Sequence, residues 1–355
     1  MRQVKVLVHG DDYASTGKLA DLKWFQAKLE GKFDMKTQIV GHSKEPGVVT
    51  EARILNRVVR ATSGGGEYEC DQRHVEIILE QLELPAGTGA LGTPGVEDVT
   101  PAASEGGEIP ENDQPLPAGL ASLYRAITAR ANYIAQDRSD IQYAVKELCR
   151  RMSNPSNGDL KKLQRLGRYL VGKPRAVALY PWMATRAALD LYTDANWAGC
   201  KVSRKSTSGG AAQLGPHTLR TWSKTQNTIA QSSAESELLS IVRAASEALG
   251  LMSLAEDLGM TLKSRVHVDA SAALGILDRR GVGRVRHLDV GALWIQEQTL
   301  RKTVEFQKVK GTSNPADLMT KYLPKDGIEQ YLHALGFEAR EGRATSAVKL
   351  HTVVQ

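Results

Sequence analysis

The chain has 355 residues, of which 41% are hydrophobic and 24% charged, an ordinary balance for a protein that folds into two or three compact units. No stretch approaches the roughly 18 apolar residues of a membrane span, and the start lacks a signal-peptide pattern. The three cysteines are scattered without a C-x-x-C, which argues against zinc and disulfides and favours an intracellular location. A net charge of +6 is weak evidence for a polyanionic partner.

The first unit, residues 1–84, begins with VKVLVHGDDYASTG at residues 4–17, where an apolar run stops at Asp11 and Asp12. The pattern predicts a hairpin, and the aspartates are either its turn or half of a metal site. A helix from Lys18 to Leu29, a weak β segment and a helix over residues 71–84 follow. These elements are too few for an independent core.

Residues 85–117 carry six acidic residues and no Lys or Arg, and they are rich in Pro and Gly. Such a stretch buries too little surface to offset its ordering entropy, so we expect a disordered linker. Residues 118–183 then show helical spacing with capping residues such as Ser139 and Asp159. This helical unit carries a basic cluster that either tracks phosphates or is a solvated helix face; its members are Lys161, Lys162, Arg165, Arg168, Lys173 and Arg175.

The pattern changes in residues 184–337, where three strand-like segments precede a long amphipathic helix over residues 231–259. A strand, two helices, a strand and a helix stopped by Pro324 complete the order βββ-α-β-α-α-β-α. This order predicts an α/β unit with a mixed sheet, an antiparallel meander followed by parallel strands. Residues 338–355 read as a flexible polar tail.

Four acids lie at element ends in this unit: Asp194, Glu237, Asp269 and Asp317. Four converging carboxylates would repel one another unless hard divalent cations neutralise them. Each also has a structural reading, since Asp194 can be an exposed strand residue and Asp269 a helix cap. Asp317 follows Asn314-Pro315, a capping pair, and an acid there suits the helix dipole. Glu235 has capping-box spacing from Ser232, so Glu237 is the better candidate ligand.

Several ordered segments resemble copia-type (Pseudoviridae) retrotransposon Pol polyproteins. YTDANWAGCKVSRKSTSGG, TWSKTQNTIAQSSAESEL, VHVDASAAL, RHLDV and NPADLMTKYLP resemble the ribonuclease H region, and residues 118–155 resemble the segment before it. VLVHGDDYASTG resembles the reverse-transcriptase catalytic hairpin. The resemblance implies a ribonuclease H-like mixed five-stranded sheet with flanking helices, preceded by a helical connection and a truncated palm hairpin.

The resemblance also implies a reaction, hydrolysis of the RNA strand of an RNA–DNA hybrid. Its four metal ligands fall on Asp194, Glu237, Asp269 and Asp317, which would bind two Mg²⁺ ions, with Mn²⁺ as an alternative. One ion would activate water and the other would stabilise the leaving 3′ oxygen. Many cellular ribonucleases H have a histidine before the last acid; this chain has Lys308 and Lys310 there.

Basic and hydroxyl side chains suit contacts to phosphates and 2′-hydroxyls. The candidates for such contacts are Lys201, Arg204, Lys205, Ser206, Thr207, Ser208, Lys224, Gln226, Arg284 and Arg286. Trp222 could line the same groove but is better read as a core residue. His287 is better read as a helix-start hydrogen-bonding residue than as a ligand.

Polymerase chemistry needs a third aspartate upstream of the hairpin, so we expect Asp11 and Asp12 to be an orphaned half-site without polymerase activity. The family implies DNA integration, a Pol polyprotein context, and cytoplasmic particles that later reach the nucleus. A non-catalytic nucleic-acid-binding module, decayed or repurposed, remains open as an alternative. A third alternative is a metal-free scaffold for protein interactions, in which the basic side chains would be scattered over the surface rather than line one groove.

Overall fold

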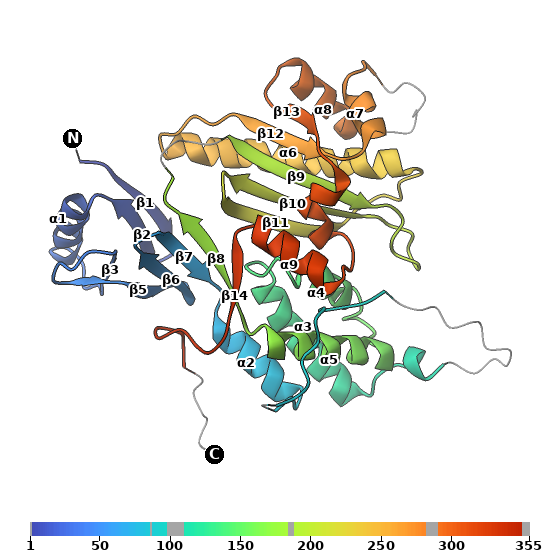
Figure 1. Cartoon of the computed structure of the whole chain (residues 1–355), viewed down its shortest axis with the longest axis horizontal. Helices are drawn as coiled ribbons and strands as arrows, with labels where there is room; N and C mark the ends of the chain where they lie inside the picture. The colour runs from blue at the N-terminus through green and yellow to red at the C-terminus, as the bar shows by residue number, and fades with distance from the viewer. Residues whose placement is uncertain (1, 86, 98–109, 184–187, 282–289, 350–355) are drawn as a thin grey trace.

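The computed structural model describes residues 2–85, 87–97, 110–183, 188–281 and 290–349. Two five-stranded sheets organise the described chain (Figure 1). The first, sheet I, has the order β11-β10-β9-β12-β13, and the second, sheet II, has the order β14-β8-β7-β6-β5. The strands of sheet I are β9 (Leu189–Asn196), β10 (Thr207–Leu214), β11 (His217–Thr225), β12 (Ser264–Val268) and β13 (Glu305–Lys308).

Sheet I is the mixed sheet that the sequence predicts. β9, β10 and β11 form an antiparallel meander, and β12 pairs in parallel with both β9 and β13. The parallel strands are reached through α6 (Ser233–Asp257) and through α7 (Ser271–Leu277) with α8 (Val290–Leu300). The predicted fold class, an α/β unit with a ribonuclease H-like five-stranded sheet, is therefore confirmed for this part of the chain.

The main core of sheet I lies between its strands and α6. Leu189 and Leu191 of β9 and Val266 of β12 are fully buried against Leu238 and Ile241 of the helix. α6 is long and apolar enough, by length and composition, to pass as a membrane span, contrary to the sequence-based expectation. Its buried apolar stripe instead accounts for it as a core helix, because that stripe packs on the sheet.

The opposite face of sheet I is covered over β10 by a short 3₁₀ helix, η3 (Pro315–Met319), and by α9 (Lys325–Ala334). Asn314 caps η3 by accepting a hydrogen bond from the Ala316 amide at 3.2 Å. Gly209 permits this close approach, because a Cβ there would lie 2.4 Å from the Thr320 methyl carbon. The sequence predicts a helix at η3 but not α9.

Sheet II joins segments that the sequence assigns to separate units. It contains β5 (Glu51–Ile54), β6 (Arg57–Thr62), β7 (Gly65–Glu69), β8 (Arg175–Pro181) and β14 (Phe337–Arg340). β7 pairs with β8, and β8 pairs with β14, both antiparallel. The boundaries expected after residues 84 and 183 therefore do not separate independent folding units.

The helices of the connection enclose a second core together with α2 (Gln72–Gln81). These helices are α3 (Ala118–Ile134), α4 (Gln142–Cys149) and α5 (Asn157–Gly172). Val75 and Ile78 of α2 are buried beside Ile127 and Leu166. Residues 70–81 are thus part of the helical unit rather than a weakly folded remnant.

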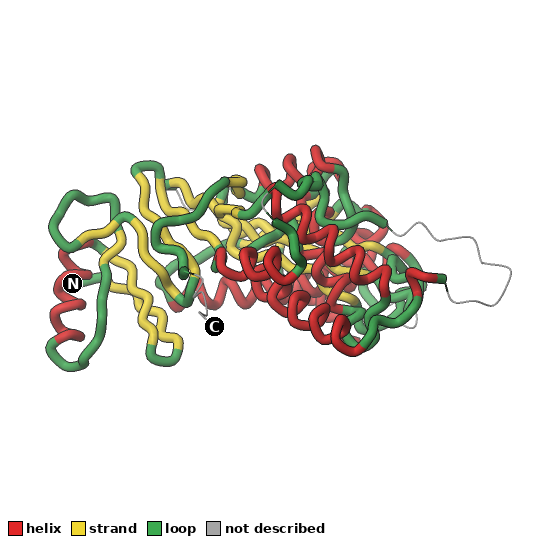
Figure 2. The backbone as a smooth tube through the Cα atoms, turned by 90° about the horizontal axis from the view of Figure 1, so that it is seen from below, coloured by secondary structure: helices red, strands yellow, loops and turns green. Residues whose placement is uncertain are grey.

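The N-terminal hairpin and α1 project at one end of the long axis (Figures 1 and 2). The hairpin pairs β1 (Val4–His9) with β2 (Asp12–Gly17), and α1 (Leu19–Glu30) has no buried residue. Two short strands, β3 (Ile39–Val40) and β4 (Val48–Val49), follow. Leu7 is 62% exposed, which agrees with the expectation that these elements lack a core of their own.

The predicted linker and tail are both more ordered than the sequence suggests. Pro94, Gly95 and Leu116 are buried, and Pro115 forms an isolated β-bridge with Ser156. A short 3₁₀ helix, η1 (Glu111–Asp113), lies just before Pro115 in the chain. The disorder prediction for 85–117 was wrong for residues 87–97 and 110–117, because contacts with α5 compensate for their poor apolar content.

The flexible tail predicted for 338–355 was wrong for residues 338–349. β14 extends to Arg340, whose guanidinium binds Glu67 at 2.7 and 2.8 Å. Ala344 and Ala347 are buried with Val58. Long-range partners, which the local sequence cannot show, therefore fix this polar segment.

Candidate active site

The alternation of β9 places Asp194 on the face of sheet I opposite α6. Leu189, Leu191 and Thr193 point toward α6, and the Thr193 hydroxyl lies 2.6 Å from that of Ser240. Side chains alternate along a strand, so Asp194 projects to the side where η3 lies. Asp269 directly follows β12, the parallel neighbour of β9. The ends of both strands therefore meet at one edge of the sheet.

Three of the four candidate carboxylates converge at this edge. One oxygen from each of Asp194, Glu237 and Asp269 lies within 4.8 Å of the others. Glu237 comes from the start of α6 and accepts a hydrogen bond from the Ala195 amide at 3.3 Å. Its other oxygen is buried without a hydrogen-bond partner among the described residues. Ser232 and Glu235 cap the helix instead, since the Ser232 hydroxyl accepts from the Glu235 amide at 3.2 Å.

Burial and mutual repulsion govern the protonation of this cluster. Desolvation, Asp194 and Asp269 together raise the pKa of Glu237 to about 9. Burial and the charge of Asp194 also raise the pKa of Asp269. Carboxyl groups whose charged forms are this unfavourable are typical of functional sites that bind a cation.

The fourth acid, Asp317, is held next to the trio by a lysine. The Lys321 ammonium lies 2.8 Å from Asp317 and 3.8 Å from Asp194, and the Thr320 hydroxyl donates to Asp194. Burial raises the pKa of Asp317 to about 6, against the opposing effect of Lys321. Sequence reasoning missed Thr320 and Lys321; the i, i+4 spacing of Asp317 and Lys321 is the one local signal for their pairing.

Four of the predicted nucleic-acid contacts are internal. Ser206, Thr207, Ser208 and Gln226 are all buried. The Gln226 side chain donates a hydrogen bond to the Ser208 hydroxyl at 2.9 Å. Lys146 of α4 donates to the Thr207 hydroxyl at 2.6 Å, and the Ala198 amide donates to the Ser206 hydroxyl at 3.0 Å. The prediction that they touch substrate was wrong, because their polar atoms instead hold β10 to its neighbours.

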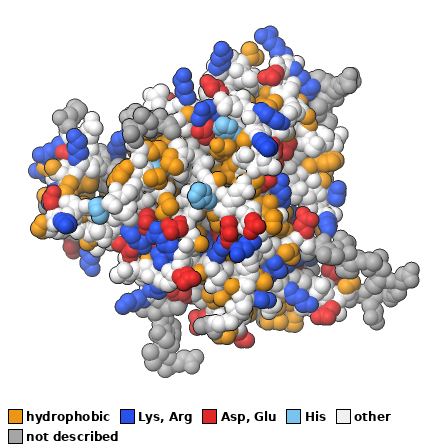
Figure 3. Space-filling model, in the orientation of Figure 1, with side chains coloured by type: hydrophobic (Ala, Val, Ile, Leu, Met, Phe, Trp, Pro, Cys, Tyr) orange, Lys and Arg blue, Asp and Glu red, His pale blue; other side chains and the backbone are white. Residues whose placement is uncertain are grey.

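The basic members of the same group remain available to solvent. Lys201, Arg204 and Lys224 are exposed and Lys205 is half-buried, and Trp197 beside them is 47% exposed. Arg284, Arg286 and His287 lie outside the described residues. Trp222 is in the core, as the sequence favours. On the face drawn in Figure 3, Lys and Arg side chains are interspersed with Asp and Glu.

The basic cluster on α5 is engaged by the chain itself. Arg168 donates to the Gly89 carbonyl at 2.8 Å, and Arg165 donates to the Thr93 hydroxyl at 2.7 Å. Lys161 donates to the Asn112 side chain at 2.9 Å. Of the other members, Lys173 binds Glu329 and Arg175 binds Glu69. Most of the cluster is therefore paired within the chain, which favours neither a phosphate track nor a freely solvated helix face.

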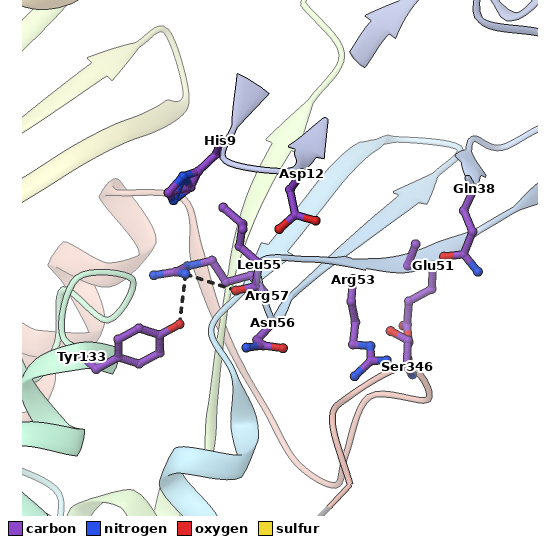
Figure 4. A pocket seen from close by; sticks show the side chains of 11 residues that line it. His9, Asp12, Gln38, Glu51, Arg53, Leu55, Asn56, Arg57, Tyr133 and Ser346 are labelled. Atoms are coloured by element: carbon purple, nitrogen blue, oxygen red, sulfur yellow. Dashed lines mark hydrogen bonds between the residues drawn. The ribbon is translucent and has the colours of Figure 1, made fainter. Parts of the chain in front are cut away.

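Asp11 and Asp12 do not form a metal site with the remaining described residues. Gly10, at φ +61°, and Asp11 make the two-residue turn, while Asp12 is the first residue of β2. Asp12 and His9 line a cavity of about 780 Å³ with Asn56, Arg57 and other residues, and Asp11 does not (Figure 4). Glu51, the other acid of this cavity, already binds Arg60 at 2.6 Å.

Comparisons with curated proteins give Pol polyproteins of plant transposons. The chain is 30% identical over 216 residues to the retrovirus-related Pol polyprotein from transposon RE1 of Arabidopsis thaliana, covering 60% of this chain and 15% of the relative. It is 25% identical over 347 residues to the retrovirus-related Pol polyprotein from transposon TNT 1-94 of Nicotiana tabacum, covering 94% of this chain and 24% of the relative. The chain thus spans under a quarter of either relative. Secreted RxLR effector protein 161 of Plasmopara viticola is 37% identical over 117 residues, 32% of this chain and 80% of that protein.

Solved structures give more distant similarities. The N-terminal RNase H domain of rv2228c from Mycobacterium tuberculosis is 14% identical with a TM-score of 0.27, covering 42% of this chain and 98% of that chain. The foamy viral protease-reverse transcriptase in complex with RNA/DNA hybrid is 11% identical with a TM-score of 0.44, covering 86% of this chain and 36% of that chain. No family model matches the chain. The curated homologues of the chain are thus retrovirus-related Pol polyproteins from copia-type transposons.

Proposed function

We propose that the chain carries a ribonuclease H that hydrolyses the RNA strand of an RNA–DNA hybrid with two Mg²⁺ ions, or Mn²⁺ in their place. The observation that carries this proposal is the convergence of Asp194, Glu237 and Asp269 at the end of β9. The family relationship supports the choice of substrate, and the Pol polyprotein context makes other polyprotein segments the expected partners.

The donor set fits a hard divalent cation. All three groups are carboxylates, which suit Mg²⁺ and Mn²⁺ better than softer ions. The unpartnered Glu237 oxygen and the raised pKa of that residue are both features that a cation would relieve. When bound, the metal supplies Lewis-acid stabilisation of the phosphate and a more acidic water.

The remaining residues of the site have distinct tasks. Thr320 orients the Asp194 carboxylate, and Ala195 orients that of Glu237. Lys321 neutralises Asp317 until substrate and metal arrive. Lys201, Arg204 and Lys205, on the loop after β9, would contact the sugar–phosphate backbone without reading sequence.

The test is cleavage of an end-labelled RNA–DNA hybrid by the full chain with Mg²⁺. We expect Asp194→Asn to reduce the rate at least about a hundredfold, because it removes charge that holds the metal. Asp326→Asn, an exposed acid at the start of α9, is the matched control and should cleave normally. Hybrid binding without cleavage by the folded wild-type chain would refute the enzyme and leave the non-catalytic binding module.

The hairpin supports no second proposal of polymerase activity. Only Asp12 of the pair lines the neighbouring cavity, and the other acid there is paired with Arg60. We therefore keep the prediction that this chain alone does not extend a primer. Incorporation of labelled nucleotide on a primed template, measured with the same preparation, checks it.

A further inference from the structure

Residues 87–97 form a strap that runs along α5 toward the candidate active site. The Leu91 amide donates to the Arg168 carbonyl at 3.2 Å, and the Arg168 side chain donates back to the Gly89 carbonyl at 2.8 Å. Arg165 adds a hydrogen bond to Thr93 at 2.7 Å. The strap is therefore fixed to α5 along its length despite its low apolar content.

The strap ends against the ring of Tyr322. Pro94 and Gly95 are buried, and a Cβ on Gly95 would lie 2.1 Å from a ring carbon of Tyr322. The Gly95 backbone therefore packs directly on the ring, an approach that only glycine allows. On another side, Tyr143 of α4 meets Tyr322 edge-on, with 4.9 Å between ring centroids and 71° between planes. A cavity of about 10 Å³ remains where Tyr143 and Tyr322 meet Pro94.

Tyr322 directly follows the residues that hold the carboxylates. Lys321 binds Asp317 and lies 3.8 Å from Asp194. Thr320 donates to Asp194, and its own carbonyl accepts from the Asn196 side chain at 3.3 Å. A shift of the Tyr322 ring would therefore move Thr320 and Lys321 relative to Asp194.

We propose that Tyr322, clamped between Tyr143 and the Pro94–Gly95 backbone, is a positioning residue for the candidate active site. The strap therefore helps to hold the candidate active site in its geometry, in addition to connecting two parts of the chain. The proposal rests on the proposed function for its rate measurement. A second measurement, the affinity for Mn²⁺ without substrate, does not need any catalytic activity.

Two glycines of the strap give a matched pair of variants. Gly95→Ala forces a methyl group into the Tyr322 ring, whereas Gly92→Ala meets the flexible Lys325 side chain at 3.2 Å. We expect Gly95→Ala to lower kcat at least about tenfold with KM for the hybrid within about twofold, since misplacement of catalytic groups costs rate and not binding. Its Kd for Mn²⁺, measured by titration of the paramagnetic signal, should rise at least about threefold. Gly92→Ala should match the wild-type chain in both.

Substitution of Tyr322 separates positioning from stability. Tyr322→Phe keeps the ring and should lose less kcat and Mn²⁺ affinity than Tyr322→Leu, which should resemble Gly95→Ala. Equal values for Gly95→Ala and Gly92→Ala, or a Tyr322→Leu chain that is folded and unchanged, would overturn the proposal. If the wild-type chain does not cleave, the proposed function fails, and the Mn²⁺ affinities of the same variants still decide the positioning role.

Discussion

At the scale of one residue, the buried carboxyl group of Glu237 makes the stability of the fold depend on pH. Its pKa is raised from 4.5 to about 9, so the folded chain binds a proton that the unfolded chain releases. Stability is therefore unaffected below about pH 4.5 and falls as pH rises toward 9. We expect Glu237→Gln to stabilise the metal-free protein by roughly 2 kcal/mol at pH 7, and by more at pH 8.

Thermal unfolding in EDTA across pH 5 to 8 measures this difference. Glu256→Gln, an exposed site on the same helix, is the control and should leave the pH dependence unchanged. Added Mg²⁺ should stabilise the wild-type chain more than Glu237→Gln. A wild-type curve that is flat with pH in EDTA would contradict the assigned environment of Glu237.

Residue types and spacing suggested that Asp194, Glu237, Asp269 and Asp317 could converge, because strand ends and helix starts meet at one edge of an α/β sheet. The family resemblance pointed to the same four residues, and the structure brings the first three together. They were not enough for Lys321 or Tyr322, whose roles depend on contacts with Asp194 and Tyr143, far away in the chain. Hydroxyl groups were misleading for a related reason. Thr207 and Ser208 satisfy buried polar partners within the fold, and local sequence does not distinguish such groups from surface contacts.

At the scale of elements, β14 is the clearest case of order imposed by distant partners. Arg340 and Arg60 lower the pKa of Glu67 to about 2. This interaction therefore stabilises the fold above about pH 4.5 and is lost as pH falls toward 2. We expect Arg340→Met to cost about 1 kcal/mol at pH 7, with a difference from wild type that shrinks below pH 4.5.

Urea unfolding at pH 7 and pH 3 tests this dependence, with Arg53→Met, an exposed arginine of β5, as the control. An Arg340→Met penalty that persists undiminished at pH 3 would show that packing and not the ion pair holds β14. The element was hard to predict because FEAR, although its apolar and charged residues alternate, is only four residues long. The same holds for residues 87–97, whose Gly and Pro content resembles disorder although α5 holds them.

At the scale of the whole molecule, the ribonuclease H-like unit around sheet I and the segments before it share one structure. α2 contributes Val75 and Ile78 to the core of the connection, and β7 continues the sheet that β8 and β14 extend beside sheet I. α4 and the residues just before it in turn contact sheet I, since the Ser139 and Thr221 hydroxyls lie 3.2 Å apart and Lys146 of α4 donates to Thr207. A fragment limited to residues 118–340 keeps the candidate site, but it leaves the β7-facing edge of β8 unpaired and the α2 side of the core uncovered.

We therefore expect residues 118–340 to be much less stable than residues 45–349. Exposure of the two buried α2 contacts alone forfeits about 2 kcal/mol each, a large share of the roughly 5–15 kcal/mol that stabilises a typical domain. Guanidinium unfolding followed by circular dichroism should give one cooperative transition for residues 45–349 and a lower midpoint, or no cooperative transition, for residues 118–340. Equal midpoints would mean that α2 and strands β5 to β7 are dispensable, and that the ribonuclease H-like unit folds without the segments that precede residue 118.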